Sequence, residues 1–186
     1  MSTAATPVGA DALARLQALL RDGGGLMATL LRAEPGGASD GHADGPAQIA
    51  ARGPRAAGHP EEYELLVEAI YEGYLLHYDR PRVVEVPEAD LRLLAGDQLY
   101  AVGLARLVAL GDIPAVAELA DTITLSALAH GAGRRELAAA VWAAGARAVG
   151  WGTDAAHEHA KQLVLSEDPG ALEAMRTSAG MPAAPS

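Results

Sequence analysis

The chain has 186 residues, of which 50% are hydrophobic and 20% charged, and its formal net charge is -10. An acidic protein repels phosphate backbones, and its 14 basic residues are scattered along the sequence, which argues against nucleic-acid binding. The sequence holds no cysteine, so disulfides, thiolate metal sites and cysteine nucleophiles are excluded.

The longest stretch without a charged residue, 122–133, falls well short of the roughly 17 to 25 residues that a membrane-spanning helix needs. The chain does not open with the charged and then apolar segments of a secretory signal. We therefore expect a cytoplasmic protein that reaches a membrane only peripherally, through a partner. The preference for Ala, Gly and Arg over Lys and Asn also suggests a bacterial origin.

Residues 1–33 are expected to contain one amphipathic helix, interrupted by glycines at 23–25. Its apolar stripe finds no partner in the segment that follows, so the helix either docks on the main domain or binds another chain. We take it as an N-terminal interaction helix, with the leucines Leu13, Leu16, Leu20 and Leu30.

Two segments have the composition of unfolded chain. In 34–60, 17 of 27 residues are Ala, Gly or Pro, and such a segment buries too little apolar surface to offset the entropy of ordering it. We expect 34–60 to be a disordered linker. Residues 167–186 turn again to Pro, Gly, Ala and Ser, and are expected to form a flexible C-terminal tail.

Residues 61–166 are expected to form the core domain, because all seven aromatic residues lie within them. Glycines and prolines divide this segment at regular intervals into stretches of helix-forming residues. The one short β-prone run, 82–86, lies between prolines and is interpreted as an extended connection. The predicted fold class is all-α: a bundle of four to five helices, with the N-terminal amphipathic helix joined through the flexible linker.

The helix expected over 61–79 carries acidic residues along one stripe: Glu61, Glu64, Glu68, Glu72 and Asp79. Carboxylates four residues apart can share a magnesium ion, and Glu68, Glu72 and Asp79 are the residues that would hold one. We favour a solvated acidic face, with a basic partner surface as the next alternative. No metal and no cofactor are therefore predicted.

Histidines give no predicted catalytic site. His77 falls on the apolar face opposite the carboxylates, where a neutral, hydrogen-bonded core imidazole is expected. His157 and His159 are two residues apart on a helix and point in different directions, so they cannot chelate one ion. The sequence also lacks the short motifs of serine hydrolases, zinc proteases, P-loop proteins and dinucleotide-binding enzymes.

Two segments together carry a family resemblance: Leu75-Leu76-His77-Tyr78-Asp79 and Leu93-Leu94-Ala95-Gly96-Asp97-Gln98-Leu99-Tyr100. They resemble the trans-type polyprenyl diphosphate synthases, in which the first segment holds magnesium and the allylic diphosphate. The Gly111-Asp112 pair and the helix after it look like the family's continuation, nearest to the small non-catalytic subunit of two-component heptaprenyl diphosphate synthases. The resemblance covers roughly residues 61 to 133.

The departures from this family concern its chemistry. Tyr78 stands where the family has its first metal-binding aspartate, Arg82 stands three residues after Asp79, and no second aspartate-rich motif follows. Only Asp79 matches, and the family's reaction needs several carboxylates around its magnesium ions. We therefore expect no prenyl transfer and no enzyme activity.

The resemblance implies a helical fold around an apolar tunnel and a surface for a second subunit, both of which survive without catalysis. The residues taken as contacts for a partner or lipid are large and apolar or aromatic: Tyr71, Tyr74, Tyr78, Leu94, Leu99, Trp142 and Trp151. For Trp142 and Trp151 we favour ordinary packing over a role as interface anchors.

The function that these observations favour is a non-catalytic accessory or scaffold subunit. It would form homo- or hetero-oligomers, bind a partner enzyme and, as a further possibility, hold an isoprenoid or quinone chain. One alternative is a scaffold or membrane-tethering subunit of a quinone-linked oxidoreductase complex. Others are a remodelled magnesium-dependent prenyl diphosphate enzyme and a helical module that acts through protein contacts alone.

Overall fold

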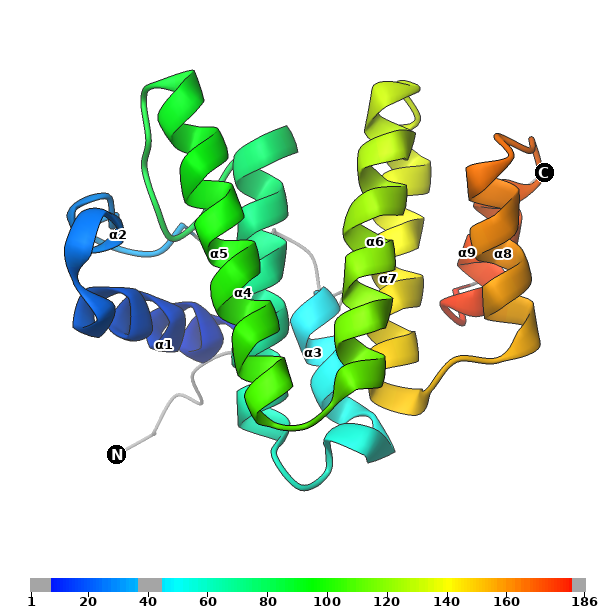
Figure 1. The fold of residues 1–186 in the computed structure, drawn as a ribbon, viewed down its shortest axis with the longest axis horizontal. Helices are drawn as coiled ribbons and strands as arrows, with labels where there is room; N and C mark the ends of the chain where they lie inside the picture. The colour runs from blue at the N-terminus through cyan, green and yellow to red at the C-terminus, as the bar shows by residue number, and fades with distance from the viewer. Residues whose placement is uncertain (1–7, 37–44, 182–186) are drawn as a thin grey trace, which may run out of the picture. The chain divides into compact units, whose positions relative to one another are not determined.

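The computed structural model describes residues 8–36 and 45–181, and the predicted all-α fold class is confirmed (Figure 1). The count in these ranges exceeds four to five helices, because short helices occupy segments expected to lack structure. The helices are α1 (Val8–Gly23), α2 (Gly25–Thr29), α3 (Pro46–Arg52), the 3-10 helix η1 (Pro54–Ala56), α4 (Pro60–Tyr78), α5 (Ala89–Ala109), α6 (Ile113–Gly131), α7 (Arg135–Trp151), α8 (Ala155–Leu165) and α9 (Ala171–Ser178).

The chain divides into two compact units rather than one core domain with appendages. Unit 1 consists of Met1–Gln48 and Glu61–Arg106, and unit 2 consists of Ile49–Pro60 and Leu107–Ser186. The predicted domain 61–166 is therefore wrong in its bounds, because the division falls inside it. Helical periodicity marks where each helix runs, but it does not say which helices share a core.

The N-terminal helix packs into the core of unit 1. Leu13, Leu16 and Leu20 are at most 4% exposed, and they cluster with apolar residues of α4 and α5 such as Leu65 and Leu99. Of the two placements left open by the sequence, docking on the chain's own domain is found. The interpretation of these leucines as contacts for another chain is wrong, since they are already buried; Leu30 is half-buried against the same cluster.

The segment expected to be a disordered linker is helical over much of its length. Pro46–Arg52 forms α3 and Pro54–Ala56 forms η1, and Ala47, Ala50 and Ala56 are fully buried. Gly53 of this segment lies so close to the backbone of Gly150 in α7 that any side chain would overlap it. Small residues, which suggested disorder, here permit close packing. Residues 37–44 lie outside the described residues.

The connection between α4 and α5 is extended, as predicted. Val83 and Val84 are fully buried, and Val84 forms an isolated antiparallel bridge with Leu31. The amide of Glu85 donates to the carbonyl of Leu30 (2.8 Å), and the amide of Arg32 donates to the carbonyl of Val83 (3.0 Å). The chain that follows α2 is thereby fixed to the α4–α5 connection within unit 1.

In unit 2, α6 and α7 pack side by side, and α8 and α9 complete a second apolar core (Figure 1). Asp112 begins α6, because its carboxylate accepts the amide of Ala115 (3.1 Å) and an Arg55 guanidinium from the η1 helix (2.6 Å). Gly145 allows the close approach of α6 and α7: a Cβ there would overlap the hydroxyl of Thr122.

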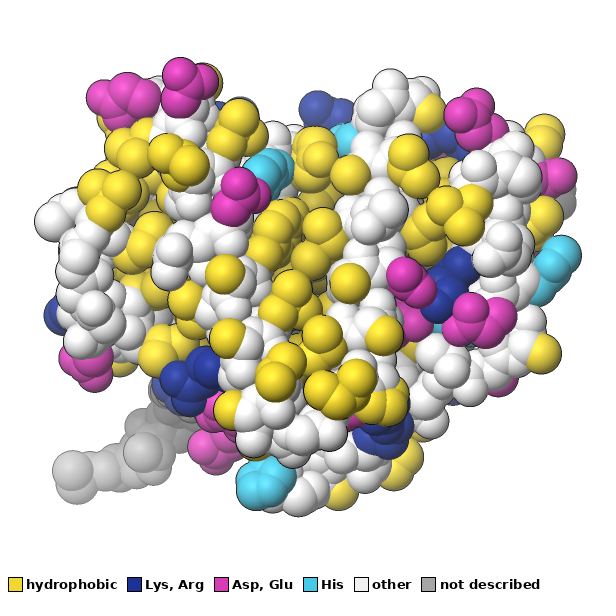
Figure 2. Space-filling model, in the orientation of Figure 1, with side chains coloured by type: hydrophobic (Ala, Val, Ile, Leu, Met, Phe, Trp, Pro, Cys, Tyr) yellow, Lys and Arg dark blue, Asp and Glu magenta, His cyan; other side chains and the backbone are white. Residues whose placement is uncertain are grey.

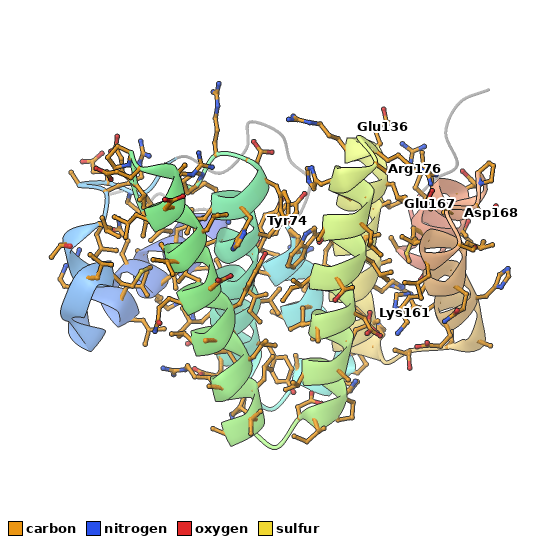
Figure 3. The ribbon with its side chains drawn as sticks, turned by 45° about the horizontal axis from the view of Figure 1, so that its top comes forward. Tyr74, Glu136, Lys161, Glu167, Asp168 and Arg176 are labelled. Atoms are coloured by element: carbon orange, nitrogen blue, oxygen red, sulfur yellow. The ribbon has the colours of Figure 1, made fainter. Side chains whose placement is uncertain are left out.

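The predicted flexible tail is also wrong for its described part. Residues 171–178 form α9, whose Ala171 and Met175 are at most 1% exposed in the core of unit 2. Arg176 pairs with Glu136 of α7 at 3.3 Å (Figure 3). Two buried side chains one helical turn apart are enough to anchor the segment, although its composition is that of a loop. Across the described ranges, no helix combines the length and apolar character required to cross a bilayer.

The docking of α1 predicts that Leu16→Ala destabilises the protein by about 2 to 5 kcal/mol, because it leaves a cavity in the core of unit 1. Leu26→Ala is the matched control, since Leu26 is 53% exposed. Urea unfolding followed by far-UV circular dichroism measures both. Equal, small effects of the two substitutions would mean that α1 is not docked.

The contact of α6 with α7 predicts that Gly145→Ala costs about 1 to 3 kcal/mol of stability by overpacking. Gly131→Ala, also on a helix, meets nothing within 4 Å and should be neutral or stabilising by up to about 1 kcal/mol. The same unfolding measurement compares them, and a stabilising Gly145→Ala would contradict the packing described above.

Candidate functional site

The middle of the acidic stripe of α4 is buried, which corrects the expectation of a solvated face there, whereas Glu61 and Asp79 at its two ends are exposed. Glu64, Glu68 and Glu72 are 6%, 2% and 0% exposed. A buried carboxylate is tolerated only where charges and hydrogen bonds replace its lost hydration. The replacing groups come from other parts of unit 1, which helical spacing within α4 does not reveal.

Arg82, in the connection after α4, neutralises two of these carboxylates. Its guanidinium pairs with Glu68, and its Nε lies 3.4 Å from Glu72 Oε2. The other oxygen of Glu72 accepts the backbone amides of Arg82 and Val83, both at 2.6 Å. The guanidinium also lies over the ring of Tyr71, 5.2 Å from its centre. Arg82 thus holds the α4–α5 connection against α4.

The charges in this cluster oppose the cost of burial. Burial raises the pKa of Glu68 above its usual value, and the positive charge of Arg82 acts against that rise. For Arg82, burial acts to lower the pKa, but Glu68 and Glu72 outweigh it and the pKa is raised. The guanidinium therefore stays charged and holds the two carboxylates.

Glu64 is held by the N-terminal helix. Its carboxylate pairs with Arg15 of α1 and accepts the side-chain amide of Gln48 at 3.2 Å. The stripe of carboxylates on α4 thus receives guanidinium groups from α1 and from the α4–α5 connection. These contacts are structural, since they join α1 and the α4–α5 connection to α4.

The three candidate metal ligands do not come together. Glu68 and Glu72 are engaged by Arg82, whereas Asp79 is exposed at the end of α4 and accepts the amide of Arg80 (2.9 Å). Within 8–36 and 45–181 there is no cluster of three or more His, Cys, Asp or Glu residues suited to a metal ion. The hypothesis of a metal site at Glu68, Glu72 and Asp79 is wrong in its geometry.

Aromatic side chains form a row along α4. Tyr71 and Tyr74 stack at 5.6 Å between ring centres, and Tyr74 and Tyr78 lie 5.5 Å apart. His77 stacks on Tyr100 of α5 at 5.3 Å. Burial raises the pKa of Tyr71 and of Tyr100 above the usual value for tyrosine. Tyr71 and Tyr78 are half-buried, whereas Tyr74 is buried.

His77 is not a fully enclosed core histidine. It is half-buried, and its Nε2 lies 3.2 Å from the exposed carboxylate of Asp97. A Cβ on Gly96 would overlap the His77 ring, and Gly73 in turn touches Tyr100. Glycines on both helices therefore let α4 and α5 cross closely enough for this stacking.

Three of the predicted partner or lipid contacts are buried. Leu99 is fully buried in the core of unit 1, Tyr74 is 6% exposed on α4, and Trp142 is 2% exposed on α7. Leu94 on α5 and Trp151 on α7 are 63% and 40% exposed. The interpretation of Tyr74, Leu99 and Trp142 as contacts for a partner is corrected. The exposed Leu94 and Trp151 and the half-buried Tyr71 and Tyr78 stay predictions.

Basic side chains that are scattered in the sequence gather in one place. An open cavity of about 410 Å³ in unit 1 is lined by the arginines Arg32, Arg80, Arg82 and Arg92. Three of them have structural partners: Arg92 donates to the carbonyls at the end of α4, Arg32 lies 4.0 Å from Glu85, and Arg82 holds the buried carboxylates. Their main role is to fix the α4–α5 connection.

The solvent-facing side of α6 is almost entirely apolar. Ile113 and Leu128, near its two ends, are 57% and 49% exposed. Between them the outward positions carry Val116, Ala117, Ala120, Ile123, Thr124 and Ala127. Thr124 donates its hydroxyl to the carbonyl of Ala120 (2.9 Å), and the one charge at the edge, Asp121, is paired with Lys161. We call these residues the α6 face.

Figure 2 shows hydrophobic side chains exposed over α6 and, in unit 1, over α5. On a helix at the surface, charged residues usually occupy the outward positions. Sequence reasoning assigned α6 to the core and missed this face, although the spacing of Ile113, Ala120 and Leu128, with few charges between them, was visible. Apolar residues on both sides of a helix give no periodicity to read.

Comparisons with protein-family models, curated proteins and solved structures find no match to this chain. The resemblance to polyprenyl diphosphate synthases therefore stays a prediction. Function has to be argued from the geometry of the chain itself.

The cluster around Arg82 predicts that Arg82→Met destabilises the protein by about 3 to 5 kcal/mol, because it leaves Glu68 and Glu72 buried without a counter-charge. Arg80→Met, at an exposed neighbouring position, should change stability by less than about 0.5 kcal/mol. Urea unfolding at pH 8 measures both, and Arg82→Met combined with Glu68→Gln should recover more than about 1 kcal/mol.

The destabilisation caused by Arg82→Met should depend on pH. Because the pKa of Glu68 is raised in the folded protein, protonation of this carboxyl contributes stability. That contribution is complete below the usual pKa of 4.5 and is lost as the pH rises through the pKa of the folded state. Without Arg82 the pKa of Glu68 is raised further, so the destabilisation should be smaller at pH 5 than at pH 8. A cost that is constant over this range would contradict the role of Glu68.

Proposed function

We propose that this protein is an accessory or scaffold subunit that takes no part in prenyl transfer and self-associates through the α6 face. The observation that carries the proposal is the long, uncharged, solvent-facing side of α6. Contiguous exposed apolar surface with no charge on it is typical of a protein contact.

The α6 face favours a second copy of the same chain as its occupant. Bulky side chains lie near both ends, at Ile113 and Leu128, and small ones lie between, at Ala117 and Ala120. In a two-fold dimer, the same surface meets itself with its direction reversed. Two such helices could cross at their alanines while Ile113 of each chain packs beside Leu128 of the other.

The distribution of charge favours an apolar surface as the partner of the α6 face. The chain carries a formal net charge of -10, which opposes association between copies, but none of that charge lies at the centre of the α6 face. The carboxylate of Asp121, at the edge, is 2.8 Å from the ammonium of Lys161. Bringing two copies together there therefore leaves no buried charge without a partner.

The proposal extends to the enzyme that such a scaffold would serve. The sequence resemblance favours the catalytic subunit of a polyprenyl diphosphate synthase, with an isoprenoid or quinone chain as a further ligand. A quinone-linked oxidoreductase complex is the alternative partner. Mild purification from the native cell followed by mass spectrometry separates the two by the identity of the enzyme and the lipid recovered.

Self-association predicts a dimer at micromolar concentration that Ala120→Arg weakens at least tenfold, because the substitution places a charge at the centre of the contact. Ala139→Arg is the matched control, since Ala139 is an exposed alanine on α7. Sedimentation velocity of the full chain measures both variants. A monomeric wild-type protein, or a dimer that Ala120→Arg leaves intact, would refute self-association through α6.

A further inference from the structure

Three polar side chains from three helices of unit 2 form a continuous hydrogen-bonded chain. The hydroxyl of Ser178, the last residue of α9, lies 2.7 Å from Nδ1 of His157 on α8. The other ring nitrogen, Nε2, lies 2.8 Å from a carboxylate oxygen of Glu118 on α6. These are the residue types and contacts of a nucleophile, a base and the group that orients the base.

One tautomer of His157 suits both of its partners. A carboxylate accepts, so in this tautomer Nε2 carries the proton and donates to Glu118. In the neutral imidazole Nδ1 is then the acceptor, and the Ser178 hydroxyl donates to it. This is the tautomer required for the imidazole to take a proton from the serine.

Lys161 of α8, labelled in Figure 3, pairs with the carboxylate of Glu118. Its ammonium lies 3.3 Å from the second carboxylate oxygen of Glu118 and 2.8 Å from Asp121. Burial acts to lower the pKa of Lys161, but its hydrogen bonds to Asp121 and Glu158 and the charge of Glu118 outweigh this, and the pKa is raised. The ammonium of Lys161 therefore stays charged beside Glu118.

The backbone holds His157 in place. Asp154 caps the start of α8 and accepts the amide of His157 at 2.8 Å, so the imidazole projects from the first turn of the helix. His157 and Glu118 are each 4% exposed, whereas Ser178 is half-buried. His157 and its carboxylate are thus mostly buried, whereas Ser178 keeps part of its surface exposed.

Ser178 differs from other hydroxyl residues on the described helices. Thr122, Thr124, Ser126 and Ser166 donate their hydroxyls to carbonyl groups of their own helices. The Ser178 hydroxyl instead contacts an imidazole. A hydroxyl that only donates to a backbone carbonyl of its own helix makes no contact with an imidazole.

The serine and the histidine line a pocket of about 190 Å³, together with Arg147, Trp151, Thr153 and Asp154. The Arg147 guanidinium lies over the Trp151 ring, 5.1 Å from its centre. It also lies beside Gly180, two residues after Ser178, because a Cβ built there would be 3.8 Å from the guanidinium carbon. A fixed cation therefore stands in the same small pocket as the hydroxyl.

We propose that Ser178, His157 and Glu118 form a catalytic triad that hydrolyses esters of small acyl groups, with Arg147 stabilising negative charge on the carbonyl oxygen. The small size of the pocket favours a short acyl group. This activity goes beyond the proposed scaffold function and is separate from it, since Glu118 lies on the buried side of α6.

The reaction balances with the groups present and water. Ser178 Oγ bonds to the ester carbonyl carbon as its proton passes to His157 Nδ1, and the carbonyl π electrons move to oxygen, where Arg147 faces them. The carbon–oxygen bond of the ester then breaks, and the alcohol leaves with the proton from Nδ1. Water attacks the acyl-serine in the same way, releasing the acid and restoring the Ser178 hydroxyl.

The test uses the purified full chain with two reagents: a fluorophosphonate probe, which bonds to activated serines, and p-nitrophenyl acetate. We expect one probe adduct, located on Ser178 by peptide mass spectrometry, and hydrolysis that falls at least about 100-fold in Ser178→Ala. Thr177→Ala removes the neighbouring exposed hydroxyl and should change neither result.

A second variant separates catalysis from folding. Glu118→Gln keeps the size of the side chain, and circular dichroism reports whether the helices persist. In a folded Glu118→Gln protein, probe labelling should slow at least about tenfold, because the imidazole loses the carboxylate that orients it. Absence of an adduct on Ser178 in the folded wild-type protein, or equal hydrolysis by wild type and Ser178→Ala, would overturn the proposal.

Discussion

Unit 1 depends on the burial of carboxylates along α4. Glu72 is fully buried, and it is stable there because the amides of Arg82 and Val83 donate to one of its oxygens while the Arg82 guanidinium faces the other. These bonds set the path of the connection after α4. That path in turn presents Val84 to Leu31 and so fixes the segment that follows α2. A helix that is buried on nearly every side needs such compensation, since an unpaired charge in the same place would cost several kcal/mol.

The polar groups of unit 2 have a different arrangement. In unit 1, each buried carboxylate meets a guanidinium or backbone amides, which serves to hold segments together. In unit 2, Glu118 meets an imidazole that also reaches a partly accessible hydroxyl beside a pocket. The contacts in unit 1 are fully explained by their contribution to stability. The arrangement in unit 2 includes a half-buried hydroxyl at a pocket, which stability does not require, and this is why a chemical role is proposed for it.

Helix α6 takes part in both proposals because its two sides differ. Its buried side supplies Glu118, Thr122 and Leu125 to unit 2, and its exposed side carries the apolar α6 face. A helix with apolar residues on both sides is typical of a protein interior or of an interface. The scaffold function and the proposed hydrolytic site can therefore be separated by substitutions on opposite sides of one helix.

The sequence by itself determined the all-α class, the helices at the centre of the chain and the extended run of Val83, Val84 and Val86, because these follow from local periodicity and from proline and glycine positions. Only the tertiary structure decided the rest. The sequence predicts a solvated stripe at Glu64, Glu68 and Glu72, because their partners, Arg15 and Arg82, lie outside the helix. The sequence predicts no regular structure for 46–56 and 171–178, because their apolar content is low. The structure shows helices there that are held by a few buried contacts. Ser178, His157 and Glu118 are up to sixty residues apart in sequence, and no spacing rule connects side chains that meet only when three helices pack.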